Sequence, residues 1–213
     1  MTYSHVLWDF NGTLLDDVNV CMESVNLLLS RRGLPILRSR EEYQSHFRFP
    51  IEDYYAHVGF DFTKDPYPVL AHEWIAEYRA REQTAPLCPG AEEALRYVKA
   101  LGITQVLFSA TERKMLEEQA VGLGIRQYFD HIVGNDNIYA EGKIAQGKWW
   151  MERIRPEKAL LIGDTVHDAA AANAMGIDCI LVAAGHQSRQ TLEGTGYPVV
   201  ADLHEFAKKK MLE

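Results

Sequence analysis

The sequence predicts an α/β fold: a Rossmann-like, doubly wound parallel sheet core with an inserted α-helical cap domain. Two observations lead to this prediction. Short apolar runs recur along the chain with helical segments between them, which is typical of a parallel sheet covered by helices, and one connection is far too long for this pattern. The runs predicted as strands are Val6–Trp8, Ile103–Phe108, His131–Val133, Ala159–Ile162, Cys179–Val182 and the weaker pair Val199-Val200.

Two connecting helices have recognisable ends. A helix from Ala91 to Leu101 follows Pro89-Gly90 and stops at Gly102. Another, from Ala169 to Met175, stops at Gly176. A glycine just past the last helical residue suits a C-cap, because glycine adopts the left-handed conformation without steric cost.

The long connection lies between the first and second predicted strands and spans about 90 residues. A right-handed crossover needs only one helix, so an inserted domain is the economical explanation. The insertion should open with an amphipathic helix, because apolar residues recur from Val18 to Leu29 at helical spacing before Gly33 and Pro35. Further helices are predicted at Arg40–Phe47, Ile51–Val58 and Pro68–Arg81. We therefore predict a core of residues 1–15 and 86–213 and a helical cap of residues 16–85.

The composition of the chain limits the classes of binding partner that we expect. The 213 residues carry a formal charge of −8, which argues against a general nucleic-acid or anionic-membrane surface. No apolar run approaches the roughly 20 residues of a membrane span. The cysteines Cys21, Cys88 and Cys179 are far apart and form no CxxC pair, which favours a reducing compartment. We expect a cytoplasmic protein, monomer or homodimer, with no nucleic-acid or membrane partner.

Two acidic clusters follow two predicted strands. Asp9-Phe10-Asn11-Gly12-Thr13 comes directly after Val6–Trp8, and Gly163–Asp168 comes directly after Ala159–Ile162. Ligands of open parallel sheets bind beyond the carboxyl ends of the strands, so the two clusters should converge there as one metal site. An aspartate after a strand is also an ordinary helix N-cap, and Asp168 before Ala169 suits that alternative.

Together these features resemble the haloacid dehalogenase superfamily with a helical cap of the first type, in its phosphoglycolate-phosphatase-like branch. The resemblance covers essentially the whole chain. Asp9 matches the nucleophile of the first motif, and Ser109 in Leu107-Phe108-Ser109-Ala110-Thr111 matches the second. Lys143 matches the third motif, in preference to Lys148, which lies in a helical stretch where a solvated lysine is ordinary. Asp164 and Asp168 match the fourth.

The resemblance implies a phosphatase that acts on a small phosphorylated metabolite through an aspartyl-phosphate intermediate. It implies one Mg²⁺ cofactor, held by Asp9, Asp164, Asp168 and the backbone carbonyl of Asn11. Oxygen ligands of this kind are those that Mg²⁺ prefers, and the cation would relieve repulsion between the carboxylate and the phosphoryl group. The phosphoryl group would be bound by Ser109, Ala110, Lys143 and Gly12.

Position 11 departs from the family pattern. Phosphatases of this family usually carry a second aspartate there as general acid and base, a role worth about 10² to 10⁴ in rate, and Asn11 cannot titrate. Three alternatives stay open. The substrate has a good leaving group such as an acyl phosphate, or the protein is a slow phosphatase or binds a phosphorylated ligand or partner, or Asn11 slowly deamidates to aspartate beside Gly12.

The cap should select the leaving group. Candidates for substrate contact are His46, Arg48, Tyr54 and Tyr55, although aromatic residues at helical spacing usually pack in a core. Lys64 could form a Schiff base, as the cap lysine of phosphonoacetaldehyde hydrolases does, but its polar surroundings favour a solvated loop.

Four further residues are ambiguous. His167 and His186 lie near the predicted site, and His167 is the more interesting, although a histidine beside an acidic metal site is often only a supporting partner of a ligand. Trp149 and Trp150 are predicted to pack, with a dimer face as the lesser alternative.

Overall fold

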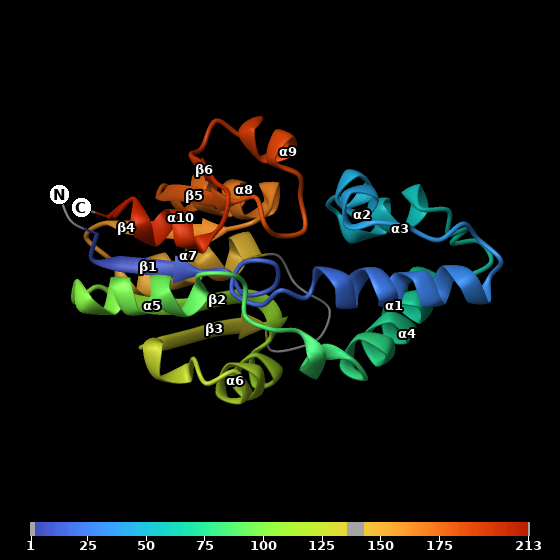
Figure 1. The fold of residues 1–213 in the computed structure, drawn as a ribbon, viewed down its shortest axis with the longest axis horizontal. Coiled ribbons are helices and arrows are strands. Elements are labelled where there is room, and N and C mark those ends of the chain that lie inside the picture. Colours follow the sequence, from blue (N-terminus) through green and yellow to red (C-terminus); the bar gives the residue numbers. More distant parts are fainter. Residues whose placement is uncertain (1–2, 136–142, 213) are drawn as a thin grey trace.

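The protein's computed structural model describes residues 3–135 and 143–212. Its six strands form one parallel sheet in the order β3-β2-β1-β4-β5-β6 (Figure 1). The strands are β1 (His5–Trp8), β2 (Thr104–Glu112), β3 (His131–Asn135), β4 (Ala159–Gly163), β5 (Asp178–Val182) and β6 (Val199–Val200). The doubly wound α/β core is therefore confirmed, with every predicted strand present.

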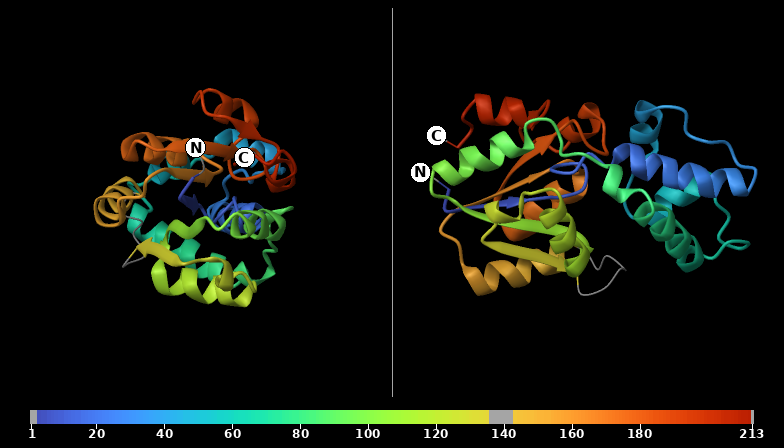
Figure 2. Two further views of the ribbon diagram at one scale, coloured as in Figure 1. Left: turned by 90° about the vertical axis from the view of Figure 1, so that its left-hand side faces the viewer. Right: turned by 60° about the horizontal axis from the view of Figure 1, so that its bottom comes forward.

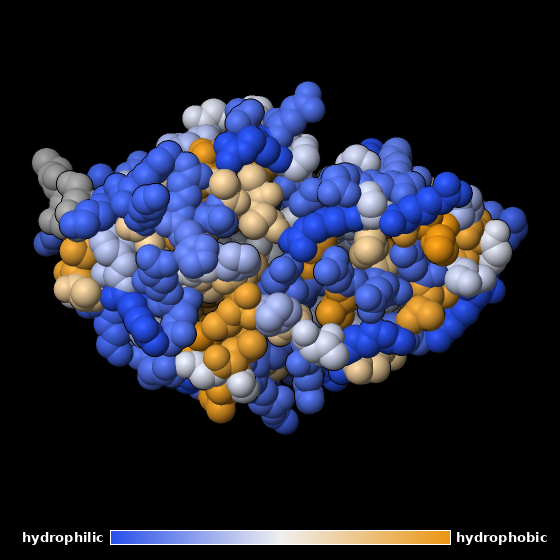
Figure 3. Space-filling model, viewed as in Figure 1, coloured by the Kyte–Doolittle hydropathy of each residue, from blue (hydrophilic) through white to orange (hydrophobic). Residues whose placement is uncertain are grey.

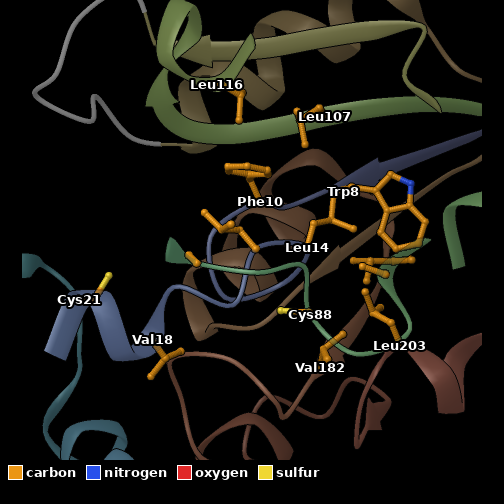
Figure 4. Packing of buried hydrophobic residues seen from close by; sticks show 14 of the residues in the cluster. Trp8, Phe10, Leu14, Val18, Cys21, Cys88, Leu107, Leu116, Val182 and Leu203 are labelled. Carbon is orange, nitrogen blue, oxygen red and sulfur yellow. The ribbon is translucent and has the colours of Figure 1, made fainter. Parts of the chain in front are cut away.

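Helices cover both faces of the sheet. Neighbouring residues of a strand point to opposite faces, so these apolar strands present a hydrophobic surface on each side. Trp8 belongs to the core cluster beneath α5 (Ala91–Ala100), α6 (Arg113–Gly122) and α10 (Leu203–Lys208), whereas Leu7 belongs to the other cluster. Figure 4 shows Trp8, Leu107, Leu116 and Leu203 within the first cluster. The second cluster packs under α7 (Lys143–Ile154), α8 (Val166–Met175) and α9 (Arg189–Glu193).

A group of helices lies beyond the carboxyl ends of the strands, at the end of the molecule opposite the two termini (Figures 1 and 2). These are α1 (Val18–Arg31), α2 (Arg40–His46), α3 (Ile51–His57) and α4 (Tyr67–Arg79), followed by a short 3₁₀ turn at Glu82–Thr84. All four helices begin and end within two residues of the predicted bounds. The limits of a cap domain at residues 16 and 85 stay a prediction.

These helices touch the core at several points. Gln44 of α2 donates to the carbonyl of Gly185 at 2.7 Å. The ring of Phe49 stacks on His167 of α8 with centroids 4.7 Å apart, and Arg79 of α4 pairs with Glu112 of β2 at 3.3 Å. The helices are thus docked over the carboxyl edge of the sheet.

The outer face of the molecule is mostly hydrophilic in the view of Figure 3. Trp150 is buried as predicted, but the packing prediction is wrong for Trp149, which is 57 % exposed and lies beside the guanidinium of Arg153. In the described ranges, no helix is long and apolar enough to cross a membrane.

Candidate active site

The two acidic clusters meet at the carboxyl ends of β1 and β4, the neighbouring strands from which the chain continues toward opposite edges of the sheet. Asp9 follows β1, which pairs with β2 on one side and β4 on the other. Asp164 follows β4, and Asp168 lies in the first turn of α8. Ligand oxygens of the three buried carboxylates all lie within 4.8 Å of one another. The two clusters thus meet beyond the carboxyl ends of their strands, as predicted, and this place is also the switch point of the sheet. That they hold a metal stays a prediction.

Lys143, the first residue of α7, lies between two of these carboxylates. Its buried ammonium donates to Asp9, and to Asp168 at 2.5 Å. Burial opposes the charge, but the two carboxylates outweigh it and raise the pKa of Lys143 above its ordinary value. Lys148 is exposed on the same helix, so the preference for Lys143 agrees with the geometry.

Asp168 both supports its helix and faces the site. The N-cap of α8 is Thr165 rather than Asp168, because α8 begins at Val166, three residues earlier than predicted. Asp168 Oδ2 accepts the Thr165 N–H at 3.0 Å and completes a capping box. Its other oxygen accepts from Lys143, so the helix cap fixes the orientation of a site carboxylate.

The turn after Asp9 holds the carboxylates in place. The Thr13 hydroxyl lies 3.0 Å from Asp9 Oδ2 and 3.2 Å from Asp164 Oδ1. Gly12 has a φ of +75°, and a Cβ there would lie 2.3 Å from Asp164 Oδ2, so only glycine fits. The Gly12 N–H already donates to Asp17 Oδ1 and to the Leu15 carbonyl. Its role in phosphate binding stays a prediction.

The donor set and its charge suit a divalent cation. Three carboxylates against one ammonium leave two negative charges in a buried space. Burial raises the pKa of Asp9 and of Asp164, since nearby cations compensate them incompletely. Carboxylate oxygens without sulfur or imidazole are the ligands that Mg²⁺ prefers. Asp9, Asp164 and Asp168 are therefore suited to hold Mg²⁺.

Both polar atoms of the Asn11 side chain form hydrogen bonds within one network. Its Nδ2 donates to Asp17 Oδ2 at 2.7 Å and to the Tyr78 hydroxyl at 3.0 Å, while its Oδ1 accepts from Thr111 Oγ1 at 2.8 Å. The sequence did not single out Asp17, Tyr78 or Thr111. Asp17 precedes α1 and is indistinguishable by sequence from a helix N-cap, yet its side chain makes no cap bond.

His186 joins this network on the other side of Asp17. Its ring Nε2 lies 3.2 Å from Asp17 Oδ1, and its ring Nδ1 lies 2.9 Å from the Tyr43 hydroxyl. Its backbone N–H donates to Asp164 Oδ2 at 2.6 Å. Burial works against the imidazolium, but Asp17 raises the pKa of His186 to about 9. His167 differs, since burial lowers its pKa. His186 is the histidine integrated into the site.

The second motif lies at the end of β2. The Ser109 hydroxyl donates to Thr111 Oγ1 and accepts the Thr111 N–H, both at 3.1 Å. The Ala110 carbonyl accepts from Asn135 at 2.7 Å. Ser109 and Ala110 both line the cavity described next.

One cavity of about 750 Å³ joins the carboxylates to the helices that cover them. Every predicted site residue except Gly12 lines it, and so do Tyr54 and Tyr55. The lining does not include the other cap candidates, His46 and Arg48. Lys64 is also outside it and pairs with Asp61 at 3.2 Å on the surface, as expected of a solvated loop.

Comparison with known proteins agrees with this geometry. Residues 6–182 match the family described as haloacid dehalogenase-like hydrolase. A phosphoglycolate phosphatase of Chromobacterium violaceum is 26 % identical, over 95 % of this chain and 96 % of that protein. Another, from Caulobacter vibrioides, is 25 % identical over 94 % and 86 %. A haloacid dehalogenase-like hydrolase of Streptococcus pneumoniae shares the fold, with a TM-score of 0.83 at 19 % identity over 98 % of both chains.

Proposed function

Because the chain belongs to the haloacid dehalogenase-like hydrolase family, we propose that it is a Mg²⁺-dependent phosphatase of a small phosphorylated metabolite. The observation that carries the proposal is the convergence of Asp9, Asp164, Asp168 and Lys143 in the lining of one cavity. The names of the similar phosphoglycolate phosphatases support the same reaction class.

In the proposed reaction an Asp9 oxygen attacks phosphorus, and the bond from phosphorus to the leaving oxygen breaks. The leaving oxygen keeps the bonding pair and takes up a proton from solvent water, which the proton released in the hydrolytic step replaces. Water then attacks the aspartyl phosphate, which releases inorganic phosphate and a proton and restores the Asp9 carboxylate. Asp9, Asp164, Asp168 and the Asn11 carbonyl would hold Mg²⁺, which would reduce the repulsion between the Asp9 carboxylate and the phosphoryl group.

The chain's own groups orient and neutralise the reactants. Thr13 and Lys143 each hold one oxygen of Asp9, which fixes the direction of the carboxylate. The ammonium of Lys143 also offsets charge that develops on the phosphoryl oxygens. Ser109 lines the cavity and has a hydroxyl that can donate to a phosphoryl oxygen if it turns away from Thr111.

Asn11 sets the expected efficiency. An amide cannot protonate the leaving oxygen, so turnover of simple alkyl phosphates should be about 10² to 10⁴ slower than with an aspartate acid. The amide is nevertheless well placed to hold Asp17, Tyr78 and Thr111 together. A protein that binds a phosphorylated ligand with little turnover is the alternative that the test must separate.

The test is phosphate release from phosphomonoesters and acetyl phosphate with Mg²⁺, in the native protein and in Asp9→Asn. We expect native turnover that chelation of Mg²⁺ stops and that Asp9→Asn lowers by about 10⁴-fold. Lys148→Ala, at an exposed position on the helix that carries Lys143, is the control and should keep native turnover. Phosphate release that persists in Asp9→Asn would refute the proposal. Binding of phosphate without release by the native protein would favour the alternative.

A further inference from the structure

We propose that the leaving group of the substrate is uncharged and aromatic, so that the enzyme acts on the phosphomonoester of an aromatic alcohol. This inference rests on the proposed function, and it specifies what fills the part of the cavity that lies under the helices. It differs from the substrate named for the similar proteins, in which the leaving group carries a carboxylate.

The first observation is the chemistry of the cavity wall. Where helices α2–α4 and their connections line the cavity, Tyr43 and Tyr78 lie next to the reacting groups, and six further aromatic residues line the rest together with Pro50, Ile51, Glu52, Ala71 and Ile75. The six are Phe47, Phe49, Tyr54, Tyr55, Tyr67 and Trp74. A wall of this composition favours a ring that can stack or meet another ring edge to face.

The aromatic wall begins directly beside the reacting groups. On one side, Trp74 stacks on Tyr78 with centroids 5.0 Å apart and planes 21° apart, and the Tyr78 hydroxyl contacts Asn11. On the other side, Phe47 stacks on His186 at 5.1 Å and 29°. A phosphoryl group at Asp9 would therefore place the next few atoms of its substrate between aromatic rings.

The charges of the cavity disfavour a second anion. Among its described lining residues, Lys143 is paired with Asp9 and Asp168, and Arg79 is paired with Glu112. The imidazole of His186 is paired with Asp17, and that of His167 is covered by Phe49. The residues outside the described ranges contain no Lys, Arg or His. A carboxylate on the leaving group would therefore find no cationic side chain without a partner among the described lining residues.

Tyr54 supplies a second, independent observation. Its side chain lines the cavity and is only 3 % exposed, and its hydroxyl has no hydrogen-bond partner among the described residues. Buried polar atoms are nearly always paired. An uncharged hydrogen-bonding substituent on the aromatic ring would satisfy this hydroxyl without adding charge to the cavity.

The binding experiment uses inert phosphonates, so that turnover is not required. We would measure the dissociation constants of benzylphosphonate and phosphonoacetate by calorimetry with Mg²⁺. These ligands share the phosphonate and differ in carrying a ring or a carboxylate. We expect benzylphosphonate to bind at least about tenfold more tightly, because it alone gains ring contacts. Equal binding, or tighter binding of phosphonoacetate, would overturn the inference.

Two variants locate the contact. Trp74→Ala should weaken benzylphosphonate about tenfold and leave phosphonoacetate nearly unchanged, because it removes one stacking surface. Trp149→Ala removes an exposed tryptophan that does not line the cavity and should change neither constant. If Trp74→Ala weakens both ligands equally, or if Trp149→Ala reproduces its effect, the ring does not bind in this cavity.

Turnover separates the inference from the proposed function. Benzyl phosphate and phosphoglycolate both release alcohols rather than phenols, so their comparison reports recognition more than leaving-group reactivity. A higher kcat/KM for benzyl phosphate is expected. Asp9-dependent turnover that favours phosphoglycolate would overturn the inference and keep the phosphatase. Selective binding of benzylphosphonate without any Asp9-dependent turnover would overturn the phosphatase and keep the aromatic site.

Discussion

The two walls of the cavity are built on opposite principles. At the carboxyl edge of the sheet, buried ionisable side chains form ion pairs and hydrogen bonds with one another, as Lys143 does with Asp9 and Asp168. Under the helices, aromatic surface faces the same cavity, and the Tyr54 hydroxyl has no partner in the described parts of the chain. The paired side fixes the geometry of the proposed chemistry. The unpaired side leaves interactions for the substrate to complete.

The network around Asn11 belongs to the paired side, and this gives the unusual residue a structural reason. Asp17 Oδ2 accepts from Asn11, Tyr78 and the thiol of Cys21. A carboxylate at position 11 would face this acceptor at hydrogen-bond distance. The amide at position 11 and the carboxylate at position 17 are therefore complementary.

The largest change in stability is expected from breaking that complementarity. Asn11→Asp should lower the free energy of unfolding by about 4 kcal/mol at pH 8, because it places a second, half-buried carboxylate at hydrogen-bond distance from the buried Asp17. The loss should shrink at pH 5, where the two carboxylates can share one proton. Urea unfolding at both pH values, with chelator present, measures the effect.

The matched control exchanges the two side chains. The double variant Asn11→Asp with Asp17→Asn again has one amide and one carboxylate, and it should recover at least part of the lost stability. If the double variant is less stable than both single variants together predict, the two positions are not complementary in this sense.

A smaller effect is expected from pH through His186. Its pKa is raised from 6.5 to about 9 in the folded protein, so folding favours the protonated form. The stabilisation is fully present below pH 6.5 and is lost as the pH rises through 9, by at most about 3 kcal/mol. Unfolding at pH 6.5 and pH 9.5 should show this decline in the native protein and a flatter profile in His186→Gln. If stability falls by the same amount between these pH values in the native protein and in His186→Gln, the decline does not come from His186.

The smallest expected changes in the free energy of unfolding come from removing the hydroxyls of two buried tyrosines. Tyr54→Phe removes a hydroxyl that has no partner among the described residues, and it should raise the free energy of unfolding by about 1 kcal/mol. Tyr43→Phe removes a hydroxyl that is paired with His186 Nδ1, and it should lower the free energy of unfolding by about 1 kcal/mol. Thermal melts of both variants measure these changes. A change in the same direction in both variants would show that the Tyr54 hydroxyl has a hydrogen-bond partner in solution.

The paired wall was largely predictable from sequence, because its residues lie in short local patterns. Asp9 and Asp164 each follow an apolar strand, and a parallel sheet necessarily brings such strand ends together. Lys143 could be chosen over Lys148 through the family resemblance and the helical context of Lys148.

The aromatic wall and the Asn11 network were not predictable in this way. Tyr54 and Tyr55 have the spacing of ordinary core residues, and both are indeed buried while they also line the cavity. Asp17 resembles a helix cap, and Tyr78 reaches Asn11 across 67 residues of sequence. Contacts between separate helices depend on how the helices pack, which no local pattern encodes.

The most direct test of the proposed chemistry is to locate the phosphoryl group on the protein. The native chain would be mixed with Mg²⁺ and benzyl phosphate, quenched in acid within one turnover, and analysed by peptide mass spectrometry. We predict one phosphoryl group on Asp9, and none in Asp9→Asn. Turnover with no phosphorylated residue, or with the phosphoryl group on any other residue, would contradict it.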